Sequence, residues 1–207
     1  MRKKLSQEDR DWFCQARDPV EALRKFEGIC QNLEWPDVHQ QSSFQPLKEI
    51  FVGARYAYHL RALSVRCLAN DNTEHPDCEI VHSDRNLEFV EVTAAELVGR
   101  RNPSFQGIAD DKGNWRKEYF IPSEWEAACR KAVDKKITKP YPRQHYTLLI
   151  YLNGFWLHPE ESINRATLTS ATRAGAEKFS RVAILNDGVR ITFENGHEKW
   201  RRICRFS

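Results

Sequence analysis

Apolar residues recur every three or four positions over the first third of the chain, which is the spacing of amphipathic helices. The segment Asp18-Pro19-Val20-Glu21 combines an N-cap residue, a proline at the first helical position and a glutamate at the third. It predicts a helix that ends at Trp35, because the residue before a proline avoids the helical region. A shorter helix is expected over 6–17. A long one should follow Pro46, with an apolar side formed by Leu47, Ile50, Phe51, Ala54, Tyr58, Ala62 and Val65.

The middle of the chain changes to the alternating pattern of strands. Residues 78–82 and 87–93 flank the polar segment 83–86, and together they predict an antiparallel hairpin. One face of the second strand is formed by Leu87, Phe89, Glu91 and Thr93, and the other by Glu88, Val90 and Val92. A carboxylate among apolar residues, as Glu91 is here, is costly to bury unless it is paired or bound to a cation.

The last part of the chain alternates between helices and strands. We expect a helix over 123–137, a strand buried on both faces over 146–152, and another helix over 160–178. A final pair of strands is predicted over 181–185 and 189–193, on either side of a tight turn.

This order of elements predicts an α/β fold, with a mixed central sheet flanked by helices. The length of 207 residues fits one domain over 46–207, with an N-terminal helical extension over 1–45 packed on it. The polar segment 98–122 is longer than most connections and therefore indicates a functional or disordered loop, with one further strand over 118–121.

Composition narrows the class of protein. Apolar residues make up 41% of the chain and charged residues 29%, as in globular domains. No apolar run is long enough to span a membrane, and no apolar stretch follows the charged start. We therefore expect a cytoplasmic protein without a membrane partner. The six cysteines form no C-x-x-C pair, which favours reduced thiols over disulfides or a zinc site.

Charge is distributed unevenly along the chain. Residues 71–96 hold eight carboxylates and one arginine, whereas residues 130–143 hold six basic residues and one aspartate. The end of the chain, over 198–207, is also basic. Such a pattern suits a cation site beside a phosphate-binding surface. It is equally typical of solvated faces on an ordinary surface.

Two carboxylates come together if the hairpin forms as predicted. Asp77, after Pro76, stands at the start of the first strand, and Glu91 lies late on the second with Thr93 on the same side. Carboxylate oxygens with a backbone carbonyl between them suit a hard cation such as Mg²⁺ or Mn²⁺. The alternatives are that Asp77 only caps a turn and that Glu91 forms a buried salt bridge with Lys135 or Lys136.

Over about residues 46–152 the sequence resembles the PD-(D/E)XK nuclease superfamily, which has the restriction-endonuclease-like fold. The resemblance rests on a helix, Pro76-Asp77 at the start of a strand, Glu91-Val92-Thr93 on the next strand, then a helix and an apolar strand. It implies that Asp77 and Glu91 bind the metal, that Glu49 is an additional ligand, and that Lys136 is the basic residue of the following helix. Thr93 stands where the family has its lysine.

The resemblance implies a metal-dependent endonuclease that hydrolyses phosphodiester bonds in DNA, or else in RNA, with Asp77, Glu91, Thr93 and Lys136 at the catalytic site. Phosphate contacts are expected from Lys131, Lys135, Lys139, Arg143 and Arg116, and base stacking from Trp115. Because Thr93 carries no charge, an inactive nuclease scaffold that binds nucleic acid or a protein partner is the alternative function. A homodimer is compatible with either function.

Overall fold

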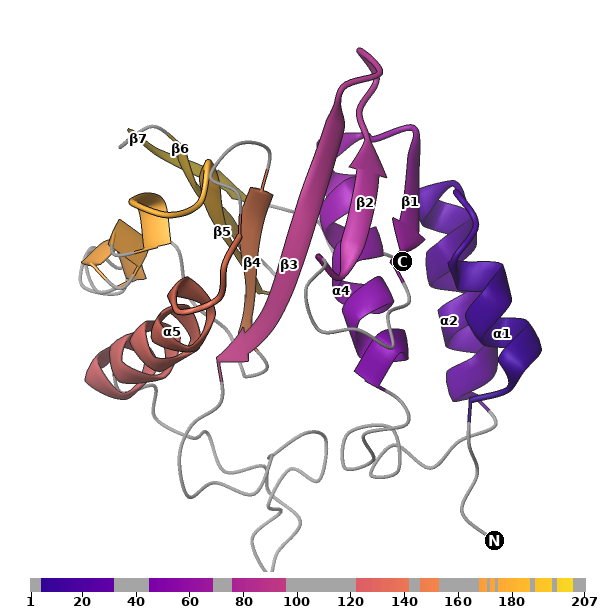
Figure 1. Cartoon of the computed structure of the whole chain (residues 1–207), viewed down its shortest axis with the longest axis horizontal. Helices are drawn as coiled ribbons and strands as arrows, with labels where there is room; N and C mark the ends of the chain where they lie inside the picture. Colours follow the sequence, from indigo (N-terminus) through magenta and orange to yellow (C-terminus); the bar gives the residue numbers. More distant parts are fainter. Residues whose placement is uncertain are drawn as a thin grey trace, which may run out of the picture. The chain divides into compact units, whose positions relative to one another are not determined.

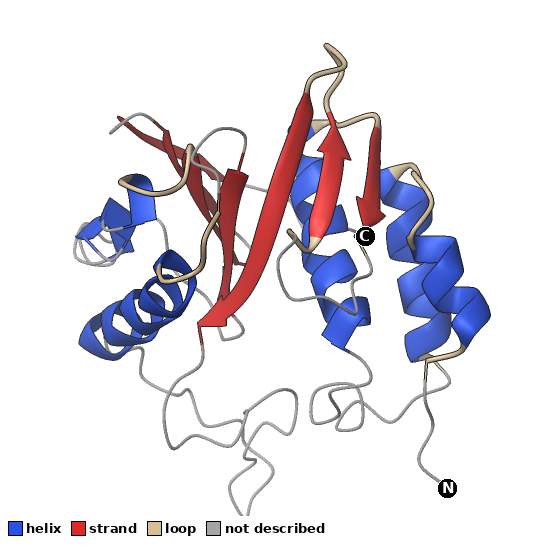
Figure 2. Cartoon of the chain, in the orientation of Figure 1, coloured by secondary structure: helices blue, strands red, loops and turns tan. Residues whose placement is uncertain are grey.

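The computed structural model describes ten stretches of the chain, namely residues 5–31, 45–68, 76–95, 122–141, 146–152, 168–170, 172–173, 175–186, 189–194 and 197–202. The chain divides into two compact units. The first comprises Met1–Val92 with Tyr141–Leu149, and the second comprises Thr93–Pro140 with Ile150–Ser207. Both units combine helices and strands (Figures 1 and 2), which confirms the α/β class.

Helices α1 (Gln7–Phe13) and α2 (Pro19–Cys30) open the first unit. The Asp18 carboxylate accepts the backbone N–H groups of Val20 and Glu21 at 2.8 and 3.2 Å, which confirms the predicted start of α2. The end expected at Trp35 falls among residues 32–44, which lie outside the described residues.

Helix α4 (Gln45–Leu60) confirms the long helix predicted after Pro46, but it is shorter than expected. Arg61 adopts a positive φ of 56°, which ends the helix. Val65 was predicted on the apolar side of this helix, and that placement is wrong. It lies instead on strand β1 (Ser64–Cys67), which the sequence pattern did not predict.

Four strands follow one another in the sheet of the first unit, in the order β1, β2 (Cys78–Val81), β3 (Leu87–Ala95) and β4 (Tyr146–Leu152), the last residues of β3 and β4 belonging to the second unit. Strands β2 and β3 are antiparallel, with Cys78 opposite Val90 and Val81 opposite Leu87, so the predicted hairpin is confirmed.

Helix α4 packs against β1 and β2, and α2 packs on α4. Phe26 of α2 stacks on Phe51 of α4 with ring centroids 4.2 Å apart. Leu47, Ile50 and Ile80 are almost fully buried between these elements, so the first unit has its own apolar core. The domain boundary expected between residues 45 and 46 stays a prediction, because it falls at the edge of a segment outside the described residues.

The second unit contains α5 (Pro122–Ile137) and a meander of β5 (Arg181–Asn186), β6 (Val189–Glu194) and β7 (His197–Arg202). Helix α5 and strands β4 to β6 confirm the predicted elements. Strand β7 was expected only as a basic tail, but it pairs with β6, with Trp200 opposite Ile191.

Other expectations for the second unit reach beyond the described residues. The helix expected over 160–178 is described only in fragments from residue 168 onward, which include helical turns. The strand expected over 118–121 and the loop over 98–121 lie outside the described residues. Within the described ranges, no helix is long and apolar enough to cross a membrane.

Candidate functional site

The register of the β2–β3 hairpin places the two candidate carboxylates at neighbouring positions. Cys78 stands opposite Val90, so one step further along the register brings Asp77 opposite Glu91. Residues directly opposite each other on an antiparallel pair point to the same face, with Cβ atoms about 5 Å apart. That Asp77 and Glu91 share one side of the hairpin stays a prediction, because Asp77 directly precedes β2 and the pairing ends at Cys78 and Val90.

A hydrogen bond holds Asp77 in that position. Its Oδ2 atom accepts the backbone N–H of Val92 at 2.6 Å, and its backbone carbonyl accepts the N–H of Leu68 at 2.9 Å. Asp77 is thereby attached to β3 through its side chain and to the end of β1 through its backbone. This contact differs from the alternative in which Asp77 only caps a turn, because its carboxylate accepts a hydrogen bond from the neighbouring strand.

Glu91 lies in the interior, with only 1% of its surface exposed. Burying a carboxylate to this degree is costly unless hydrogen bonds or positive charges compensate. Tyr141, which is 8% exposed, lies beside it. Burial, together with the nearby negative charges of Glu91 and Asp77, raises the pKa of Tyr141 well above its usual value.

The sequence pattern does not indicate that Tyr141 lies near Glu91. The segment 130–143 stands out in the sequence only by its basic residues, and nothing in its composition distinguishes this tyrosine. Two prolines flank Tyr141 in the sequence, at 140 and 142. A proline restricts its own backbone and that of the residue before it, so the two prolines are the local sequence feature that limits the backbone of Tyr141.

Glu49, on α4, lies near the same group of side chains. Gln45 donates a hydrogen bond to its carboxylate at 2.8 Å, and the Cys78 thiol lies 3.6 Å from its backbone carbonyl. Burial and then the nearby Cys67, Asp77, Glu49 and Glu91 raise the pKa of the Cys78 thiol far above its usual value. All three expected metal ligands therefore lie within electrostatic range of one buried thiol.

These three carboxylates do not form a ready-made cage. Among the residues that the structure describes, no group of three or more His, Cys, Asp and Glu side chains is arranged to hold a metal ion. A site made of Asp77 and Glu91 nevertheless suits Mg²⁺, which is commonly bound by one or two carboxylates and retains several waters.

The remaining predicted site residues are distributed as follows. Thr93 and Lys136 are buried, each with 8% of its surface exposed, and both belong to the second unit. Lys131 and Lys135 are exposed on α5, and Lys139 is half-buried after it. Trp115, Arg116 and Arg143 lie outside the described residues. The salt bridge between Glu91 and Lys135 or Lys136 stays an alternative.

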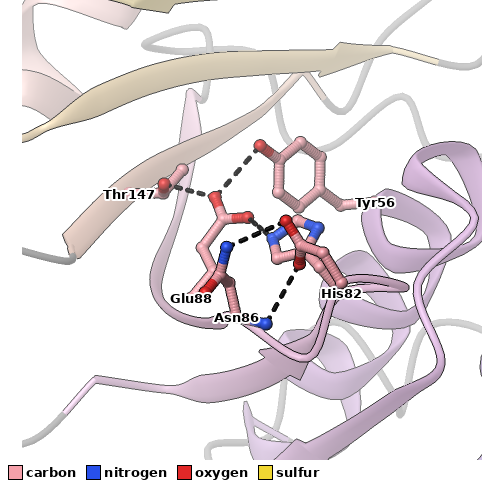
Figure 3. A network of polar contacts seen from close by, with 6 residues as sticks. Tyr56, His82, Asn86, Glu88 and Thr147 are labelled. Atoms are coloured by element: carbon pink, nitrogen blue, oxygen red, sulfur yellow. Dashed lines mark hydrogen bonds and ion pairs between the residues drawn. The ribbon is translucent and has the colours of Figure 1, made fainter.

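A second buried carboxylate occupies the opposite face of β3 (Figure 3). Glu88 Oε1 accepts hydrogen bonds from the Tyr56 hydroxyl at 3.3 Å and from the Thr147 hydroxyl, and Oε2 lies 2.5 Å from His82 Nε2. These contacts join α4, the turn after β2, and strands β3 and β4. The sequence pattern placed Glu88 on this face but did not predict that it would be 7% exposed.

The two buried glutamates have different surroundings. Three side chains surround Glu88 and link neighbouring elements, as in a structural network. Glu91 lies on the face that also carries Asp77, and this pair of carboxylates is the better candidate for chemistry. Comparisons of the chain with models of protein families, with curated proteins and with solved structures found no match.

Proposed function

We propose that the chain is a Mg²⁺- or Mn²⁺-dependent nuclease with a restriction-endonuclease-like core, which hydrolyses phosphodiester bonds in DNA. The observation that carries the proposal is the hydrogen bond from Val92 N–H to Asp77, which holds this carboxylate beside Glu91. The order of α4, β2, β3, α5 and β4 along the chain supports it, because the resemblance rests on this succession; β1 is an additional strand between α4 and β2.

In this proposal, Asp77 and Glu91 hold the cation, and Glu49 adds negative charge nearby. A divalent cation at such a site polarises a phosphate group and lowers the pKa of bound water. The hydrogen bond from the Val92 backbone N–H fixes one oxygen of the Asp77 carboxylate and thereby orients the side chain. Thr93 supplies no positive charge. The resemblance assigns the basic role to Lys136, and this assignment stays a prediction.

The nucleic acid is proposed to lie along basic side chains that follow the site in sequence. Lys131 and Lys135 are exposed on α5, where each presents an ammonium group to solvent. Contacts of this type bind phosphates without reading the base sequence, so binding should weaken strongly as salt rises.

The test is cleavage of supercoiled plasmid and of single-stranded DNA with Mg²⁺ or Mn²⁺. Asp77→Asn and Glu91→Gln keep the size of each side chain and remove its charge. Both variants should lose nicking, whereas Glu8→Gln, at an exposed carboxylate of α1, should cleave like the parent. Cleavage that survives both site variants would contradict the proposal.

A thermal melt separates cation binding from catalysis. A ligand that binds only the folded protein raises its melting temperature. Millimolar Mn²⁺ should therefore stabilise the parent protein and should not stabilise Asp77→Asn or Glu91→Gln. No shift in the parent would remove the cation site, and with it the proposed activity.

The second candidate function is a nuclease-fold protein that binds nucleic acid or a protein without cleaving. It is favoured by one observation, namely that Thr93 is buried and uncharged where a lysine would be needed. Salt-dependent DNA binding without cleavage, and with no effect of Mn²⁺ on the melting temperature, would favour this function over the nuclease.

A further inference from the structure

Two buried cysteines stand opposite each other on neighbouring strands of the first unit. Cys67 is the last residue of β1 and Cys78 is the first residue of β2, and the antiparallel register pairs them directly. Side chains at directly opposite positions point to the same face of a sheet. Cys67 is 4% exposed and Cys78 is fully buried, so both thiols lie in the same shielded layer.

The hydrogen bonds between β1 and β2 show which kind of position the two cysteines occupy. In an antiparallel pair, positions at which the strands exchange hydrogen bonds alternate with positions at which they do not. The Leu68 N–H donates to the Asp77 carbonyl at 2.9 Å. The next position, at which Cys67 faces Cys78, is therefore a non-hydrogen-bonded one.

Val65 gives the same alternation independently. Its N–H and its carbonyl are both bonded to Arg17, at 2.8 and 3.0 Å, so neither group is directed at β2. Cys67 lies two residues further along β1, where the backbone has the same orientation. Facing Cα atoms at non-hydrogen-bonded positions are about 4.5 Å apart, and disulfides span Cα separations of about 4.4–6.8 Å. The backbone thus brings Cys67 and Cys78 close enough for a disulfide.

Helix α4 lies against the Cys78 thiol. The Cys78 sulfur is 3.6 Å from the Glu49 backbone carbonyl, and a Cβ atom on Gly53 would lie only 2.7 Å from this sulfur. Rotation about the Cα–Cβ bond of Cys78, between staggered rotamers, exchanges the contact with α4 for one with the facing cysteine. The thiol therefore has two alternative contacts, one with α4 in the reduced state and one across the strands in an oxidised state.

We propose that Cys67 and Cys78 form a redox-sensitive pair, which a small-molecule disulfide such as glutathione disulfide converts into a disulfide between β1 and β2. One cysteine sulfur bonds to a sulfur of the oxidant, and a glutathione thiol leaves. The second cysteine then displaces the remaining glutathione from the first. In total the two cysteine thiols become one disulfide, and their two protons and two electrons end on two glutathione thiols.

The place of β1 gives the oxidant a route to the pair. Among the described strands, β1 is the terminal one in the sheet order. Elements at the margin of a structure open locally more easily than those at its centre. Because both thiols are shielded in the closed state, exchange should be slow in native buffer and faster in urea below the unfolding transition.

The test is oxidation of the parent protein by millimolar glutathione disulfide, in urea below the unfolding transition. After an acid quench, peptide mapping without reduction should find the peptide of Cys67 joined to that of Cys78, and dithiothreitol should separate them. Cys78→Ala should abolish the joined peptides. Cys129→Ala is the matched control, because it removes an equally buried thiol of α5 and should leave the joined peptides unchanged.

Urea unfolding measures whether the disulfide fits the native strands. A disulfide across so short a loop should lower the unfolding equilibrium constant of the oxidised parent by roughly tenfold or more relative to the reduced parent. Cys129→Ala should show the same difference between its oxidised and reduced forms. Cys78→Ala, treated with the same oxidant, should show none.

The results that overturn the inference are specific. Absence of the joined peptides in the parent would do so, and so would joining of Cys67 or Cys78 to a different cysteine instead. An oxidised protein that is less stable than the reduced one would show that the native strands do not present the two residues in disulfide geometry. The inference does not depend on the proposed function, so failure of DNA cleavage leaves it unchanged.

Discussion

Asp77 at the start of β2 accepts a hydrogen bond from the backbone N–H of Val92 on β3, with 2.6 Å between the two atoms. Val92 directly follows Glu91, so one bond ties the position of the first candidate ligand to the backbone of the second. The geometry of the carboxylate pair therefore depends on the pairing of β2 with β3 and on this side-chain contact together.

Asp77 should have a measurable structural role besides its proposed cation-binding role. Asp77→Ala removes the acceptor of the Val92 N–H and should lower the free energy of unfolding by about 1–3 kcal/mol. Asp77→Asn retains an oxygen acceptor and should lose much less. Metal-free urea unfolding of both variants measures this difference, and equal losses would show that the hydrogen bond does not stabilise the hairpin.

Substitution of Glu88 should lower the free energy of unfolding strongly, because its buried carboxylate has several hydrogen-bond partners. Glu88→Gln removes the charged acceptor of the Tyr56, Thr147 and His82 contacts and should cost about 2 kcal/mol of unfolding free energy, because the Glu88 carboxylate is buried. The control is Glu79→Gln. Glu79 also pairs with a base, Arg66, but the Arg66 side chain is 41% exposed, so the loss should stay under about 1 kcal/mol.

Urea unfolding under identical conditions compares these two substitutions. If Glu79→Gln lowered the free energy of unfolding as much as Glu88→Gln, burial would not be the reason that the Glu88 network stabilises the protein. Thr147→Val, which removes one donor to Glu88, should give an intermediate loss of about 1 kcal/mol.

Gly53 should tolerate no side chain. A Cβ atom at this position would lie 2.7 Å from the Cys78 sulfur, so Gly53→Ala should destabilise the protein by about 1–3 kcal/mol. Gly28, near the end of α2, has nothing within 4 Å of its would-be Cβ. Gly28→Ala should therefore stabilise the protein by about 0.5–1 kcal/mol through helix propensity.

Thermal or urea unfolding of both alanine variants checks the opposite signs. Adding Cys78→Ala to Gly53→Ala removes the sulfur that would clash, so the two substitutions should together cost less than the sum of their separate costs. Simple additivity would show that the close approach of α4 to β2 is not the cause.

Buried thiols should be unreactive in the folded protein and should make it alkali-labile. Burial is the first cause that raises the pKa of Cys67 and of Cys129 from an ordinary value of 9.0 to about 12. Above pH 9 the unfolded chain releases these protons and the folded chain retains them, so stability should fall between pH 9 and about 12.

Alkylation by iodoacetamide at pH 8, followed by peptide mapping, tests the reactivity. Cys14 is only half-buried and should be modified first, whereas Cys67, Cys78 and Cys129 should react only after urea is added. Early modification of Cys78 in the folded protein would show that α4 does not cover it. Urea titrations between pH 8 and 11 follow the loss of stability.

Local sequence signals were sufficient to predict the elements that depend on near neighbours in the chain. The cap at Asp18 started α2, the polar turn after β2 set the hairpin, and the apolar run over 146–152 became β4. Because side chains alternate along a strand, the same pattern predicts that Glu91 and Thr93 share one face of β3. Each of these predictions depends on neighbours within about fifteen residues.

Tertiary structure alone decided what surrounds each carboxylate. Tyr141 lies near Glu91, although the two are 50 residues apart in the sequence. Tyr56 precedes Glu88 in the sequence by 32 residues and Thr147 follows it by 59, yet both donate hydrogen bonds to its carboxylate. Arg61 ends α4 in a left-handed backbone conformation that the sequence pattern does not predict. Hydrogen bonds and close packing depend on distances between atoms, and a pattern of residue types carries no such distances between remote segments.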